Sequence, residues 1–168
     1  MKKHQKTIIT VLLAVLLLAW MGRSYIRNLF PPKMNIYTAS LVSVDDNKPM
    51  TLHDYKEKVI IVSCYQTWCT DCARETPVLN QLAASIASPN FKIIYVSDED
   101  ATAVTAFRQR FSSANILFAR YLQPMSAAGI SVFPTTFLLD KNGEVIKTKL
   151  EGYNWMKEEA AIRKIMAD

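Results

Sequence analysis

Two cysteines, Cys69 and Cys72, are separated by two residues and stand between a predicted strand and a predicted helix. Residues 58–65 contain a continuous apolar run of β-branched side chains at 59–62, which is typical of a strand buried on both faces. Residues 70–87 have helical character, and the Ser-Pro-Asn that follows them ends a helix. The cysteine pair is therefore expected at the N-terminus of a helix that directly follows a buried strand.

This placement predicts thiol chemistry. The unpaired backbone N–H groups and the positive end of the helix dipole favour the thiolate of Cys69, and the thiolate is the nucleophile. An offset of three residues places both sulfurs on one side of the helix start, where they can form a redox-active disulfide. We expect Cys69 to attack a substrate disulfide and Cys72 to resolve the mixed disulfide, so the pair predicts a thiol–disulfide oxidoreductase without a cofactor.

A Cys-x-x-Cys pair has two other common uses. A structural zinc site needs a second pair of ligands, and the chain offers only Cys64, His4 and His53. We therefore expect no metal. A purely structural disulfide remains open, although a strand-to-helix turn does not need such a link.

The rest of the domain alternates between strand and helix patterns. Further strands are predicted at 36–44, 91–97, 115–118, 135–139 and 144–150, and further helices at 101–111 and 154–166. The sequence Lys-Asn-Gly at 141–143 predicts a tight hairpin turn. Strand–helix–strand order followed by a hairpin and a helix predicts an α/β fold with a central mixed sheet and helices on both faces.

The N-terminal thirty residues differ from the rest. Residues 7–22 carry no charge and are dense in Leu, Val, Ile and Ala, which is typical of a signal-peptide core or a short membrane anchor. The segment 19–22, Ala-Trp-Met-Gly, is a poor cleavage site and favours an uncleaved anchor. We therefore divide the chain into a signal-anchor at 1–30, a linker at 31–35 that begins with Pro-Pro, and a domain at 36–168.

Charge indicates topology rather than a ligand. The net charge is +5, and the first thirty residues hold five basic and no acidic side chains, which leaves fifteen of each sign in the remainder. A neutral domain excludes a nucleic-acid-binding protein of the usual basic type. Three lysines among the first six residues favour a cytoplasmic N-terminus, so we expect the domain on the outer side of the membrane, in a periplasm or at the outer face. We expect this domain to be a monomer.

Two separated motifs carry a family resemblance. The stretch 59–82 resembles the active-site segment of the thioredoxin superfamily, and more narrowly that of the membrane-anchored TlpA/ResA-type reductases. The supporting residues are Trp68, Cys69, Cys72, Glu75, Pro77 and Leu79. Residues 129–143 resemble that family's cis-proline loop and terminal hairpin, and residues 36–55 its N-terminal hairpin. The resemblance covers residues 36–165 and implies a thioredoxin-like fold with an N-terminal β-hairpin extension.

The resemblance also assigns roles in a loop far from the cysteines in sequence. It implies that Pro134 is cis, belongs to the catalytic set and lets its loop approach the cysteine pair. Phe133 would offer backbone groups to an extended substrate strand. Together with Trp68 and Thr135, Phe133 forms the predicted substrate-binding set.

An acidic residue completes the predicted catalytic set. In the reductases that this chain resembles, a glutamate at the position of Glu75 takes part in proton handling or in control of the thiol pKa. A partly buried carboxylate there would raise the thiol pKa values and could relay a proton to Cys72. Asp71 adds negative charge, and both acids disfavour thiolate and weigh against a strongly oxidising couple. A solvated helix residue is the alternative for Glu75.

Two positions depart from the thioredoxin pattern. Ser63 stands where thioredoxin has a buried aspartate, six residues before the first cysteine. Cys64 lies in the predicted buried strand, where an apolar structural role is expected and a regulatory thiol is the alternative.

The resemblance implies a reductase of extracytoplasmic protein disulfides, with cytochrome c maturation as a candidate process, and with protein thiol/disulfide substrates and a membrane electron donor as partners. An anchored copper carrier is one alternative, but such carriers resemble Cys-x-x-x-Cys with a distal histidine, and His53 is the sole candidate in the domain. A peroxiredoxin-like peroxidase is another. Its motif requires Pro and Thr where this chain has Val62 and Gln66.

Overall fold

The computed structural model describes residues 2–29, 37–111 and 115–167. It divides into two compact units, Met1–Pro31 and Pro32–Asp168. The predicted linker at 31–35 lies outside the described residues.

The first unit is one helix, α1, which runs from Lys2 to Leu29. Its large apolar side chains between Ile8 and Trp20 are exposed, with Leu18 and Trp20 the most exposed of them. Among the described residues, no helix combines the length and the apolar character needed to cross a membrane.

In the described part of the second unit, strands form a single sheet of seven in the order β2-β1-β5-β4-β3-β6-β7. The strands are β1 Leu41–Ser43, β2 Pro49–Met50, β3 Val59–Cys64, β4 Phe91–Ser97, β5 Ile116–Tyr121, β6 Thr135–Leu139 and β7 Val145–Leu150. The pairs β3–β4 and β4–β5 are parallel and the others antiparallel, so the sheet is mixed. All six residues of β3 are buried, as expected for a central strand that is covered on both faces.

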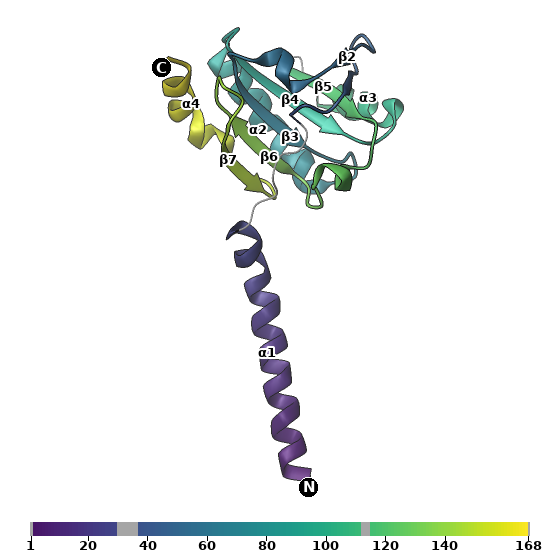
Figure 1. Ribbon diagram of the computed structural model, residues 1–168, viewed down its shortest axis with the longest axis vertical. Coiled ribbons are helices and arrows are strands. Elements are labelled where there is room, and N and C mark those ends of the chain that lie inside the picture. Colours follow the sequence, from purple (N-terminus) through teal and green to yellow (C-terminus); the bar gives the residue numbers. More distant parts are fainter. Residues whose placement is uncertain (1, 30–36, 112–114, 168) are drawn as a thin grey trace. The chain divides into compact units, whose positions relative to one another are not determined.

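Helices cover the sheet, but the two faces differ (Figure 1). The α-helices are α2 Thr70–Ile86, α3 Ala101–Arg110 and α4 Glu159–Ala167, and the 3-10 helices are η1 Leu52–Tyr55, η2 Met125–Ala128 and η3 Trp155–Glu158. Alternate side chains of β4 divide the core: Ile93 and Tyr95 pack with α2, α3 and α4, whereas Ile94 and Val96 pack with η1 and η2. The predicted mixed sheet flanked by helices is therefore confirmed, with the long helices gathered on one face.

Some element boundaries differ from those predicted. Of the strand expected at 36–44, only Leu41–Ser43 is a strand, and residue 36 lies outside the described part. The strand expected at 115–118 extends to Tyr121, because Ala119–Tyr121 pairs antiparallel with β1 and its first two residues also pair with the end of β4. β1 also pairs antiparallel with the two-residue β2.

The two C-terminal elements follow the predicted order. The helix expected at 154–166 begins as the 3-10 helix η3 before α4 starts at Glu159. The turn between β6 and β7 contains Gly143 with φ of 82°, a left-handed conformation that glycine adopts without a steric penalty. This turn brings β7 antiparallel to β6 as the hairpin requires.

Candidate active site

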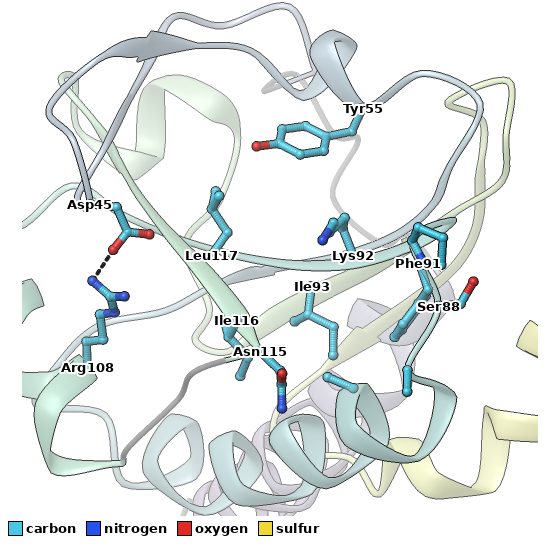
Figure 2. A pocket seen from close by; sticks show the side chains of 13 residues that line it. Asp45, Tyr55, Ser88, Phe91, Lys92, Ile93, Arg108, Asn115, Ile116 and Leu117 are labelled. Carbon is cyan, nitrogen blue, oxygen red and sulfur yellow. Dashed lines mark ion pairs between the residues drawn. The ribbon is translucent and has the colours of Figure 1, made fainter.

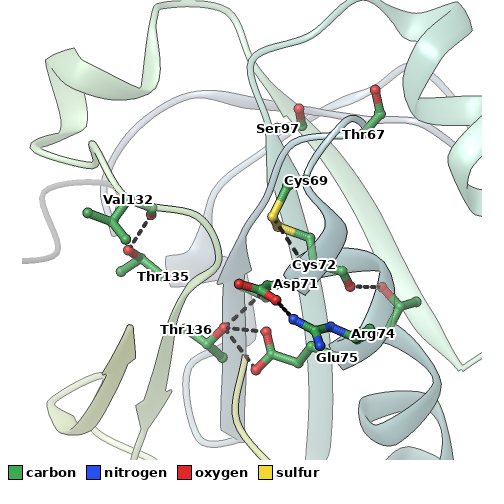
Figure 3. Close-up of a disulfide and its surroundings, with 12 residues drawn as sticks. Thr67, Cys69, Asp71, Cys72, Arg74, Glu75, Ser97, Val132, Thr135 and Thr136 are labelled. Atoms are coloured by element: carbon green, nitrogen blue, oxygen red, sulfur yellow. Dashed lines mark hydrogen bonds and ion pairs between the residues drawn. A yellow bond between two sulfur atoms is a disulfide. The ribbon is translucent and has the colours of Figure 1, made fainter. Parts of the chain in front are cut away.

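The cysteine pair lies where β3 gives way to α2, and it forms a disulfide between Cys69 and Cys72 (Figure 3). The two Cα atoms are 5.2 Å apart. Cys69 is the N-cap residue of α2, and the backbone N–H of Cys72 donates to its Sγ at 3.1 Å. The sulfur of Cys69 thus occupies the position at which unpaired helix N–H groups stabilise negative charge.

The two cysteines differ in depth. Cys69 keeps 7% of its surface exposed and Cys72 keeps 1%. An incoming substrate sulfur can therefore approach Cys69 more readily than Cys72. This order is the one that a nucleophile and a resolving cysteine require.

The loop before β6 holds a cis peptide bond between Phe133 and Pro134. In the sheet, Thr135 is the partner of Cys64, the last residue of β3. The start of β6, which follows the cis-proline loop, therefore lies beside the end of β3, from which the chain continues to the cysteine pair. The ring of Phe133 also meets that of Trp68 edge-on, with centroids 6.2 Å apart.

The predicted substrate-binding residues differ in exposure. Trp68 is 72% exposed and offers an open aromatic face beside Cys69. Thr135 is fully buried, and its hydroxyl donates to the backbone oxygen of Val132 at 2.6 Å. The side chain of Thr135 therefore stabilises the loop, and contact of this residue with a substrate would involve its backbone.

Glu75 is buried rather than solvated, with 2% of its surface exposed. The indole Nε1 of Trp155 donates to its Oε1 at 2.5 Å, and the hydroxyl of Thr136 lies 3.3 Å from its Oε2. Burial raises the pKa of Glu75 to about 7, because the carboxylate loses its hydration, and the hydrogen bonds from Trp155 and Thr136 offset only part of that increase. A group with this pKa can both accept and release a proton at neutral pH.

A hydrogen-bonded chain leads from Glu75 into the sheet. The hydroxyls of Ser63 and Thr136, which are register partners on β3 and β6, lie 2.9 Å apart. If Thr136 donates its hydrogen to Glu75, Ser63 donates to Thr136. The residue at the position of thioredoxin's buried aspartate is thus connected to Glu75, the buried acid of this chain.

Glu75 also lines a cavity of about 430 Å³. Asp71 and Arg74, which form an exposed ion pair, line it together with Gly152 and Tyr153. The cavity gives Glu75 a short route to water beside the first turn of α2.

Cys64 is fully buried and carries a free thiol. Burial raises its pKa to about 12, so the thiol stays protonated at neutral pH. It packs with Val62 and Phe137 in the core on the η1 and η2 side of the sheet. This environment supports the structural role expected for Cys64.

Figure 2 shows a larger cavity, of about 510 Å³. It is lined by the first residues of β4 and β5, whereas the cysteine loop follows the end of β3, which runs parallel to them. Asp45 and Arg108 form an ion pair at its border. It is therefore separate from the redox site.

Trp155 and Thr136 were not predicted as parts of the site. Thr136 could have been found from strand pairing, since the β3–β6 register sets it opposite Ser63. Trp155 had no local indication, because it reaches Glu75 from a segment 80 residues further along the chain.

The sheet, the disulfide at a helix N-terminus and the cis-proline loop beside it define a thiol–disulfide oxidoreductase of the thioredoxin fold. Comparison with known proteins agrees. The Redoxin family model matches residues 32–165. The chain therefore belongs to the redoxin family, as a TlpA/ResA-type member of the thioredoxin superfamily.

Individual relatives agree with this assignment. The thiol-disulfide oxidoreductase ResA of Geobacillus thermodenitrificans is 32% identical over 154 residues, covering 88% of both chains. ResA of Bacillus subtilis is 27% identical and covers 88% of this chain and 86% of its own. Among solved structures, StoA from Bacillus subtilis matches 75% of this chain and 97% of its own with a TM-score of 0.60 at 19% identity, which supports the fold alone.

The raised pKa of Glu75 has a measurable consequence for stability. In the unfolded chain the carboxyl ionises near its ordinary pKa of 4.5, whereas in the folded protein it holds its proton up to about 7. Between these values the unfolded state binds fewer protons, so the free energy of unfolding falls as the pH rises, by on the order of 3 kcal/mol. Urea unfolding of the oxidised protein across this range should show the fall, and Glu75→Gln should remove it. If the free energy of unfolding changed with pH in the same way in both proteins, burial would not be the cause of the fall.

Proposed function

We propose that the protein acts as a reductase of disulfides in other proteins, with Cys69 as nucleophile and Cys72 as resolving thiol. The observation that carries this proposal is the buried carboxylate of Glu75 one helical turn after Cys72. Together with Asp71, it places negative charge near the dithiol. Negative charge destabilises the thiolate form of the reduced protein. Strong oxidants such as DsbA are oxidising because their reduced form is stabilised, so negative charge near the dithiol favours a reductase.

The reduced protein would begin the reaction with the thiolate of Cys69. It attacks one sulfur of a substrate disulfide, the other substrate sulfur leaves as a thiolate and takes a proton, and a mixed disulfide forms. Cys72 then loses its proton and attacks the sulfur of Cys69, which releases the second substrate thiol. Two electrons pass to the substrate, and the enzyme is left with the Cys69–Cys72 disulfide.

Side chains around the pair support these steps. Glu75, as a carboxylate, accepts the proton of Cys72 and passes it to the adjacent cavity. Trp68 and Phe133 offer an aromatic surface, and the backbone beside Pro134 offers hydrogen bonds to an extended substrate segment.

The reduction potential of the Cys69–Cys72 couple tests the direction of the reaction. Equilibration with glutathione or dithiothreitol buffers should give a value nearer the about −270 mV of thioredoxin than the about −120 mV of DsbA. A potential close to that of DsbA would overturn the reductase assignment and leave the exchange chemistry intact. Glu75→Gln should shift the potential toward more oxidising values, because it removes the nearby negative charge.

We also propose that the domain works outside the cytoplasm and is held at the membrane by the N-terminal segment, where a membrane protein supplies its electrons. The support is the uncharged run at 7–22 behind a lysine-rich start. Extracytoplasmic proteins that must keep thiols reduced, such as apocytochromes c before haem attachment, are the proposed substrates. Fractionation of cells expressing the full chain should place it in the carbonate-resistant membrane fraction, with the domain open to external protease. Recovery in the cytosol would refute this placement.

A further inference from the structure

Glu99 lies in the turn between β4 and α3 and binds the loop that carries the reactive cysteine. The backbone N–H of Thr67 donates to Glu99 Oε2 at 2.6 Å, and the hydroxyl of Thr67 donates to Oε1 at 2.8 Å. Both carboxylate oxygens thus bind one residue, which stands two positions before Cys69. Hydrogen bonds to an ionised carboxylate are about twice as strong as neutral ones.

The preceding residue, Asp98, makes a similar contact one position earlier in the loop. The amide Nε2 of Gln66 donates to Asp98 Oδ1 at 2.5 Å. The other oxygen, Oδ2, accepts from the backbone N–H of Met125 at 2.7 Å, at the start of η2. Asp98 therefore joins the cysteine loop to the segment that leads into the cis-proline loop.

The acidic turn is itself fixed to the sheet. The hydroxyl of Ser97, the last residue of β4, lies 3.2 Å from both Glu99 Oε2 and the Glu99 backbone nitrogen. Arg120 on β5 donates through Nε to the backbone oxygen of Glu99 at 2.9 Å. The next acid, Asp100, caps α3 by accepting from the backbone N–H groups of Thr102 and Ala103.

We propose that Asp98 and Glu99 are positioning residues for thiol–disulfide exchange: they hold Gln66 and Thr67 and thereby fix Trp68 and Cys69 against the cis-proline loop. Trp68 is largely exposed, so its own packing supplies little of this restraint. The backbone N–H of Cys69 donates to the oxygen of Gln66 at 3.1 Å, which connects the clamped residues directly to the nucleophile. Exchange requires three sulfurs in line, so a small displacement of Cys69 slows it strongly.

Glu99→Gln tests the proposal, with Asp100→Asn as the matched control. Both changes remove one negative charge from the same turn, but asparagine can still cap α3, whereas glutamine keeps only one of the two acceptors that Thr67 uses. The rate constant of the reduced protein with a peptide disulfide should fall about tenfold in Glu99→Gln and further in Glu99→Ala. Asp100→Asn should stay close to wild type. Asp98→Asn, which also keeps one acceptor oxygen, provides a second variant should Glu99 prove necessary for folding.

Two readouts separate positioning from general destabilisation. Hydrogen exchange of the Thr67 amide should accelerate in Glu99→Gln while the amides of β3 and β4 keep their protection. The pH midpoint for alkylation of Cys69 by iodoacetamide should stay near the wild-type value, because the clamp orients the sulfur rather than setting its acidity. Equal rates in Glu99→Gln and Asp100→Asn, loss of protection throughout the sheet, or a shifted midpoint that accounts for the rate change would each overturn the proposal. None of these outcomes would affect the assignment of Cys69 as the nucleophile, because that assignment is tested separately by substitution of Cys69 itself.

Discussion

Replacement of Cys69 by serine is expected to abolish disulfide exchange, lowering the rate of substrate reduction by about 10³-fold or more. Cys69 is the more exposed of the two sulfurs and occupies the N-cap of α2, where helix N–H groups favour its thiolate. A serine hydroxyl in the same place stays protonated at neutral pH and cannot form a disulfide. The measurement is the reaction of the dithiothreitol-reduced, desalted protein with a fluorescent peptide disulfide.

Cys64→Ala is the matched control for this substitution. Cys64 is fully buried in β3, so removal of its sulfur should lower stability modestly and leave the exchange rate near the wild-type value. If Cys69→Ser kept substantial exchange activity, or if a folded Cys64→Ala lost it, the nucleophile would have to be assigned to another thiol. The second result would also revive a regulatory or catalytic role for Cys64.

The parts of the fold predicted from sequence are those with local causes. The apolar run at 58–65 predicted β3, and the cysteine pair fell at the start of α2 because a buried strand and a helical pattern flank it directly. The turn at 141–143 was equally local, since Asn-Gly specifies a tight hairpin. The cis peptide bond at Pro134 was predicted from the family resemblance and not from local propensity, because the isomer depends on a loop that the rest of the fold holds in place.

The parts that were missed depend on long-range docking. The bond from Trp155 to Glu75 joins segments 80 residues apart, and the partners of Thr67 and Gln66 lie 32 residues away. Such contacts depend on the order of strands in the sheet and on the positions of η3 and the β4–α3 turn in the folded domain. The periodicity of apolar residues does not encode these positions. The extension of β5 was missed for the same reason, because it depends on pairing with both β1 and the end of β4.

Replacement of Cys72 by alanine is expected to arrest the reaction at its midpoint. Cys69 keeps its place at the N-cap of α2 and still attacks a substrate disulfide, but the sulfur that would release the product is absent. Cys72 is almost fully buried, and Cys64 is buried in β3, so neither solvent nor the remaining thiol of the chain readily replaces it. The mixed disulfide between Cys69 and the substrate should therefore accumulate to near stoichiometry with the variant, where the wild-type protein shows only traces.

Membranes from cells expressing the full-length Cys72→Ala chain, quenched with acid and alkylated, would be resolved on non-reducing gels, and the trapped partners identified by mass spectrometry. The double variant Cys69→Ala/Cys72→Ala is the control, because it keeps the same surface without the nucleophile and should trap nothing. Equal adducts in both variants would show that capture does not pass through Cys69. If Cys72→Ala turned over substrate at the wild-type rate, resolution would have to come from Cys64 or from a thiol outside this chain, and the mechanism with Cys69 and Cys72 would be wrong. Adducts dominated by extracytoplasmic proteins would support the proposed location, since the trapped substrate reveals where the exposed sulfur of Cys69 works.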